Sequence, residues 1–193
     1  GQIEYKRYSK IVVSVSCIVV MTLVMSFAGY TQVNKLDSLY DLLDQESSLD
    51  AKAKIHLTLA DEYTSLNFDS CRHYATLAIE LALKGDMPKT VIKATIILSQ
   101  ISTYRGDFLL SDSLLRTAYH ISKKEVLREE LGNVFLAQGL LSEFQSEFAQ
   151  ALLYYDSAYQ LFDEISFKEG VGDCYMNKAI VHYSTGNLKD ALY

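Results

Sequence analysis

The sequence is poor in residues that interrupt helices and in residues that cross-link small folds. It has one proline, nine glycines, three cysteines and no tryptophan among its 193 residues. An all-β chain with many turns needs more glycine and proline, so this composition favours helices. Cys17, Cys71 and Cys174 share no CxxC spacing, and an odd number without a framework means that disulfides do not hold this fold. We expect these cysteines to be small buried apolar residues.

Basic residues are fewer than acidic ones beyond the first ten residues. The formal net charge is −6. Residues 1–30 carry +2, which leaves 15 basic and 23 acidic residues, or −8, for the remainder. Proteins that bind nucleic acid need clustered Lys and Arg, and the sequence has no such cluster. We therefore exclude nucleic acid as a partner of this chain.

Motifs for catalysis, phosphate binding and metal binding are also missing. The sequence has no GxxxxGK[ST], GxGxxG, GxSxG or HExxH. The neighbouring carboxylates Asp61-Glu62 and Glu129-Glu130 would point in different directions on a helix, so they cannot face each other as an acid/base pair. Four scattered histidines are expected to lie on the surface or to cap helices: His56, His73, His120 and His182. We predict no enzyme activity, no catalytic residue, no metal and no cofactor within this chain.

One long uncharged run stands at the N-terminus. Three basic residues among the first ten precede it, and the next charge is Lys35. Twenty helical residues span about 30 Å, enough for a bilayer core. Two interpretations stay open: a signal peptide cleaved after Ser26-Phe27-Ala28, or an uncleaved signal anchor. Because the basic residues precede the run and acidic residues follow it, the body of the protein is expected to face away from the cytoplasm.

The rest of the chain is an internal repeat. Gly106 corresponds to Ser146 and Gly186, and Ala118 corresponds to Ala78 and Ala158. A fixed period of this size, about 40 residues, indicates stacked repeats, and apolar residues within each repeat recur at helical spacing. The predicted helices cover about 34–45, a segment around 55–63, a segment from about 70 to 84, 88–105, 108–122, 125–145, 148–164 and a helix starting near 168.

Several helix ends can be predicted from single residues. Ser48 or Asp50 is expected to cap the second helix, and Asp69 or Ser70 the third. Pro88 suits the first turn of the fourth helix. In the first pair, residues of the first helix precede their counterparts in the second pair by 39 residues instead of 40, as Leu59 precedes Leu98. This predicts that the turn between the two helices of the first pair is one residue shorter. The fourth pair breaks at Gly186-Asn187, and its second helix begins with LKDALY.

Small and aromatic residues recur in a fixed order within each pair. In the third pair they are Gly139, Ser146, Phe148, Ala151 and Ala158. This order resembles the tetratricopeptide repeat (TPR), a helix–turn–helix unit with a usual period of about 34 residues. The resemblance implies an all-α, right-handed superhelix of antiparallel helix pairs, preceded by the N-terminal hydrophobic helix. The expected domains are the signal or membrane segment 1–30, a short lead-in helix at 31–49, and a repeat domain of about 3.5 units at 50–193.

In the TPR family the first helix of each pair lines a concave groove, so the resemblance also implies a binding surface. The positions favoured as binding residues are Ile96, Gln100, Tyr104, Leu136, Leu140, Phe144, Met176, Ile180 and Tyr183. The same correspondence adds Lys54, Leu57, Asp61, Thr64, Thr103, Asn133, Glu143 and Asp173. Two explanations of the apolar positions stay open: a groove for a peptide or protein, or burial under neighbouring repeats.

The chain looks like the repeat arrays of bacterial membrane-bound regulators. This implies a non-catalytic domain that senses or scaffolds a protein or peptide on the outer side of the inner membrane, with the membrane as a second partner through residues 11–30 if they are not cleaved. One alternative is the sensory part of a longer signalling protein with a histidine kinase or DNA-binding output domain. Another is a soluble periplasmic assembly factor.

Overall fold

The computed structural model describes residues 35–187, which belong to two compact units, Gly1–Gln45 and Glu46–Tyr193. In the first unit, residues 35–45 are helical, as their apolar spacing predicts. The predicted signal or membrane segment at 1–30 and the LKDALY sequence at 188–193 lie outside the described residues. Among the helices that are described, none is both long and apolar enough to cross a membrane.

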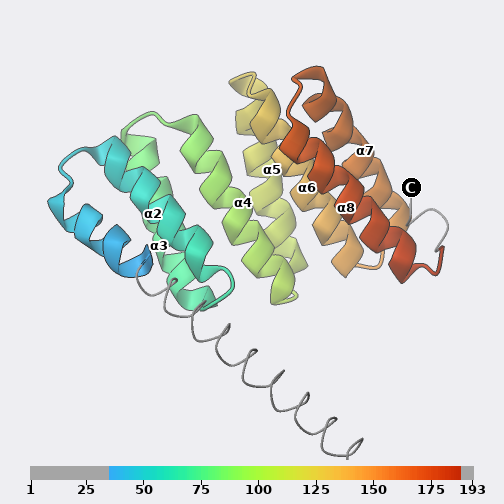
Figure 1. The fold of residues 1–193 in the computed structure, drawn as a ribbon, viewed down its shortest axis with the longest axis horizontal. Coiled ribbons are helices and arrows are strands. Elements are labelled where there is room, and N and C mark those ends of the chain that lie inside the picture. The colour runs from blue at the N-terminus through green and yellow to red at the C-terminus, as the bar shows by residue number, and fades with distance from the viewer. Residues whose placement is uncertain (1–34, 188–193) are drawn as a thin grey trace, which may run out of the picture. The chain divides into compact units, whose positions relative to one another are not determined.

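The second unit is a row of helices of nearly equal length (Figure 1), and its described residues contain no strand. The helices are α2 (Leu49–Tyr63), α3 (Phe68–Lys84), α4 (Pro88–Tyr104), α5 (Phe108–Lys124), α6 (Arg128–Phe144), α7 (Phe148–Glu164) and α8 (Lys168–Ser184). From α3 onward the helices are equally long and a three-residue link follows each, so both helices and pairs recur at a constant spacing. The period exceeds that of an ordinary TPR because the helices are longer.

The links share one conformation in which the middle residue has a positive φ. These residues are Asp86, Gly106, Val126, Ser146, Ser166 and Gly186. A left-handed residue just after a helix lets the following N–H groups bond back to the last carbonyls. At the second link, for example, the Asp107 N–H donates to the Ser102 carbonyl at 2.8 Å. Val126 has the same conformation but is β-branched, and a β-branched residue is strained at φ 56°.

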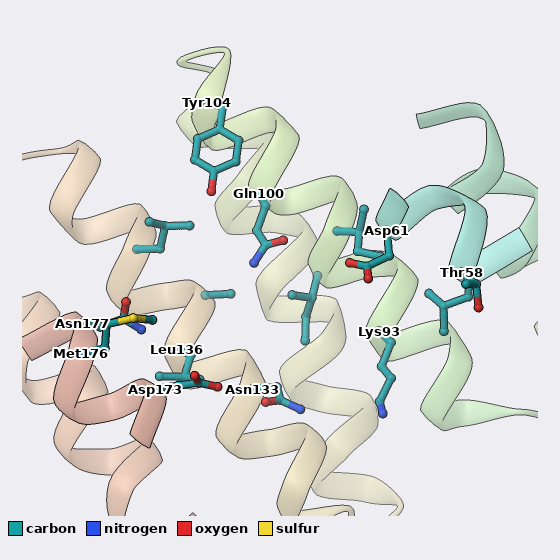
Figure 2. Close-up of a pocket in the computed structure, with 15 residues that line it drawn as sticks. Thr58, Asp61, Lys93, Gln100, Tyr104, Asn133, Leu136, Asp173, Met176 and Asn177 are labelled. Carbon is teal, nitrogen blue, oxygen red and sulfur yellow. The ribbon is translucent and has the colours of Figure 1, made fainter. Parts of the chain in front are cut away.

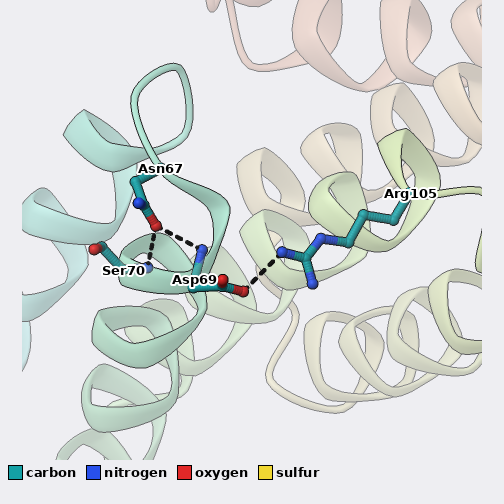
Figure 3. A network of polar contacts seen from close by, with 4 residues as sticks. All are labelled: Asn67, Asp69, Ser70 and Arg105. Atoms are coloured by element: carbon teal, nitrogen blue, oxygen red, sulfur yellow. Dashed lines mark hydrogen bonds and ion pairs between the residues drawn. The ribbon is translucent and has the colours of Figure 1, made fainter.

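The first pair departs from this pattern. Asn67, and not the predicted Asp69 or Ser70, caps α3: its side chain accepts from both of their N–H groups at 2.9 Å (Figure 3). The predicted shorter turn is also wrong. The link 64–67 has four residues, because α2 ends at Tyr63, the counterpart of Ser102, whereas α4 continues to Tyr104. Ser48 caps α2 as predicted, and Pro88 opens α4.

Helices pack in chain order, and the first helix of each pair also contacts the first helix of the next pair. No such contact joins the second helices α3, α5 and α7 to one another within the described chain. The first helices therefore form the inner, more closely spaced layer. Small residues permit this packing. The ring of Phe162 in α7 fits against Gly132 of α6 and Gly170 of α8, where a Cβ would lie 2.4 and 2.6 Å from it.

Candidate binding groove

An open groove of about 620 Å³ lies on the inner layer (Figure 2). Every lining residue comes from a first helix, α2, α4, α6 or α8. They are Leu57, Thr58, Asp61, Lys93, Ile96, Ile97, Gln100, Tyr104, Asn133, Leu136, Ala137, Leu140, Asp173, Met176 and Asn177. Because the four helices contribute at equivalent positions, the repeat itself builds the groove.

The lining includes six of the nine positions favoured from the sequence: Ile96, Gln100, Tyr104, Leu136, Leu140 and Met176. Phe144 lies next to this lining, with its ring edge-on to Tyr104 at 5.4 Å between centroids. Ile180 and Tyr183 are 46% and 72% exposed on α8 but do not line the groove. Tyr183 occupies the repeat position of Glu143, which points toward the second helix of its pair.

Four other positions carried over from the family resemblance do not line the groove: Lys54, Thr64, Thr103 and Glu143. Thr103 is 2% exposed, and its hydroxyl forms a 2.8 Å hydrogen bond with Ser111 of α5. Glu143 accepts a hydrogen bond from the Tyr155 hydroxyl in the α6–α7 interface. Burial raises the pKa of the Glu143 carboxyl, and the Tyr155 hydrogen bond opposes this; burial and that carboxylate raise the pKa of Tyr155. Thr103 and Glu143 therefore each link the two helices of their own pair.

Equivalent residues form rows along the groove, with one residue from each repeat. Ile96, Leu136 and Met176 form an apolar row, in which Ile96 is 9% exposed and also belongs to the core, whereas Met176 is 57% exposed. The residues three positions earlier on the same helices form a polar row: Lys93, Asn133 and Asp173. Positions three apart on a helix are surface neighbours, so the two rows run side by side.

Five lining residues were missed from the sequence: Thr58, Lys93, Ile97, Ala137 and Asn177. Each lies within one helical turn of a position that was predicted. Lys93 lies one turn before Ile96, and each of the other four directly follows a predicted position, so a predicted helix face wider by one residue would have included them.

Aromatic rings lie at one end of the groove. Phe68 of α3 stacks on Tyr104 of α4 with centroids 6.2 Å apart, and Tyr104 in turn meets Phe144. An ion pair braces this end, since Arg105 Nη2 lies 2.7 Å from Asp69 Oδ1 (Figure 3). The guanidinium also lies 5.8 Å from the Phe68 ring. Its hydrogen bond and charge lower the pKa of Asp69.

Charges in the groove are unevenly neutralised. Lys93 Nζ lies 3.7 Å from Glu129 Oε1 on the adjacent helix. Within the described part of the chain, neither Asp61 nor Asp173 has an ion pair or a side-chain hydrogen bond. The lining therefore offers two carboxylates without counter-ions, together with one lysine that already has an acidic neighbour.

Outside the groove, the structure shows where Cys71, Cys174 and His56 lie. Cys71 and Cys174 are buried, as predicted, and burial raises the pKa of both thiols, that of Cys174 to about 11. The described residues include no group of three or more potential metal ligands. The prediction for His56 is wrong. It is only 8% exposed and stacks on Tyr74 at 5.8 Å, because it lies on the face of α2 that packs against α3.

Paired helices with a groove lined by the first helix of each pair define a TPR-type repeat domain. The chain belongs to the family described as the SusR N-terminal TPR domain, whose model matches residues 30–131, more than half of the sequence. The match ends at the start of α6, so the groove residues on α2 and α4 lie within it. No curated protein matches this chain in sequence.

Solved structures share the fold at low identity. Aspartyl phosphate phosphatase F from Bacillus subtilis is 16% identical with a TM-score of 0.68, covering 84% of this chain and 46% of its own. A Rap protein complexed with Competence and Sporulation Factor is 15% identical with a TM-score of 0.75, covering 86% and 48%. BtubC from P. vanneervenii is 14% identical with a TM-score of 0.60, covering 82% and 68%. This chain spans about half the length of the first two.

Proposed function

We propose that this domain is the ligand-binding part of a bacterial membrane-bound regulator and that it captures a protein or peptide segment in its groove. The observation that carries the proposal is the groove itself. Apolar side chains converge there from four helices, and two of them are exposed, Tyr104 at 43% and Met176 at 57%. Water-exposed apolar surface in a concave site favours a ligand that covers it.

The location of the domain is part of this proposal. The uncharged run before Lys35, with basic residues ahead of it, supports an inner-membrane anchor and an extracytoplasmic repeat domain, or secretion to the periplasm if the run is cleaved. A fusion of alkaline phosphatase after Tyr193 tests this. Phosphatase activity in intact cells is expected, and activity only from a cytoplasmic reporter at the same place would refute it. The family's description as an N-terminal domain supports a sensory role ahead of an output domain.

Selection from a library of random peptides displayed on phage tests binding. We expect enriched peptides whose binding falls about ten-fold in Met176→Ser, because Met176 presents apolar surface in the groove. The matched control is Leu153→Ser, since Leu153 is 59% exposed on the second helix α7. Equal loss in both variants, or enrichment of no peptide, would count against the proposal.

A further inference from the structure

The apolar and polar rows constrain what the groove accepts. Figure 2 shows Asp61 and Thr58 at one side, Asp173 and Met176 at the other, and Gln100 between them. A segment lying along the groove therefore meets an apolar row and a polar row together. Its recognition needs an apolar side chain for the first row and polar groups for the second.

The carboxylates set the sign of the polar partner. Asp61 lies on α2 and Asp173 on α8, so acidic groups stand at both ends of the lining, and neither has a counter-ion within the described residues. Lys93 lies between them on α4, but Glu129 faces it at 3.7 Å. A ligand carboxylate would have to compete with Glu129, whereas a ligand cation meets two unpaired carboxylates.

The aromatic end favours the same charge. Tyr104 is 43% exposed and Phe144 is 46% exposed, and both rings present surface beside the groove. Aromatic faces attract ammonium and guanidinium groups. The protein already uses this contact once, in the approach of Arg105 to Phe68.

We propose that the groove selects peptide segments that combine a Lys or Arg side chain with a neighbouring large apolar one. The basic group pairs with Asp173 or Asp61, while the apolar group covers the row of Ile96, Leu136 and Met176. This inference rests on the proposed function, because it presupposes that a polypeptide occupies the groove. Beyond the proposed function, it specifies that the bound polypeptide carries a basic side chain next to a large apolar one.

The test uses the whole chain in lipid nanodiscs and fluorescein-labelled random octapeptides, in pools with one position fixed as Arg, Gln or Glu. Fluorescence anisotropy is expected to show Arg pools binding about five-fold more tightly than Gln pools, and Glu pools most weakly. Added salt should shrink the difference. Asp173→Asn and Asp61→Asn should each reduce the ratio of Arg to Gln binding.

The matched control is Glu80→Gln, which removes the same charge from an exposed position on the second helix α3. It should leave the ratio unchanged. Equal binding of Arg and Gln pools, a preference for Glu, or an equal loss in the control would overturn the charge inference alone. An unchanged ratio in both aspartate variants would overturn it as well. Failure of every pool to bind would overturn the proposed function too.

Discussion

Replacing Gly139 with alanine tests the close packing of α6 on α7. A Cβ at this position would lie 2.3 Å from Cε1 of Tyr155 and 2.7 Å from Cδ1 and Cζ. Ordinary contacts need more than about 3.4 Å, so the helices must separate by about 1 Å or the ring must move. Tyr155 is fully buried and its hydroxyl is bonded to Glu143, so its ring has no free space to move into.

The expected cost follows from two opposing terms. Overpacking costs up to about 3 kcal/mol, and exchanging glycine for alanine inside a helix returns about 1 kcal/mol. Gly139→Ala should therefore lower the free energy of unfolding by about 2 kcal/mol. Urea denaturation of fragment 31–193, followed by circular dichroism, measures this.

Gly172→Ala is the matched control on α8. No atom outside the helix lies within 4 Å of the added Cβ, so only the helix-propensity gain of about 0.5–1 kcal/mol applies. Opposite signs for the two substitutions support the packing argument. A Gly139→Ala protein at least as stable as its parent would refute it.

Three further substitutions probe single features. Val126→Gly should stabilise the fold by about 1 kcal/mol in urea titrations, since Val126 is 77% exposed and its positive φ is strained; a loss of stability would contradict this. Burial, then the charges of His73 and Lys52, lower the pKa of His56 below 6.5, so the unfolded chain takes up the proton first. Stability should be complete above about pH 6.5 and fall as the pH drops below it; His56→Phe should flatten that slope, and an unchanged slope would assign it to other groups. Phe144→Ala should cost only about 1–2 kcal/mol in thermal unfolding, because the ring is 46% exposed; a larger loss would identify it as a core residue.

The helices were predictable because each one repeats a simple signal. The apolar spacing and the constant repeat step place α4, α5 and α7 within about two residues of their observed ends. The small residues at helix contacts were also visible, since Gly139 faces a ring and Ser99 is 1% exposed. These features depend on residues near one another in the repeat, which periodicity detects.

What the sequence did not show depends on side-chain direction. Three neighbouring residues suit an N-cap: Asn67, Asp69 and Ser70. Asn67 is the cap because its backbone is extended, with φ −156° and ψ 109°, and its side chain accepts from the N–H groups of the other two. Thr103 and Glu143 are one residue before Tyr104 and Phe144, and about 100° of helical rotation turns them from the groove to the second helix. Among the described residues Asp61 and Asp173 have no counter-ion, and this depends on neighbouring helices, so it could not be predicted.

The most direct test of the account is where a bound peptide contacts the protein. Methyl-labelled fragment 31–193, titrated with the tightest peptide from the random library, can be followed by NMR. Shifts are expected at the methyls of Ile96, Leu136 and Met176 on the first helices, with none at Leu109 and Leu153, which are 88% and 59% exposed on second helices. Shifts confined to Leu109 and Leu153 would place binding on the other side of the repeat and contradict the groove.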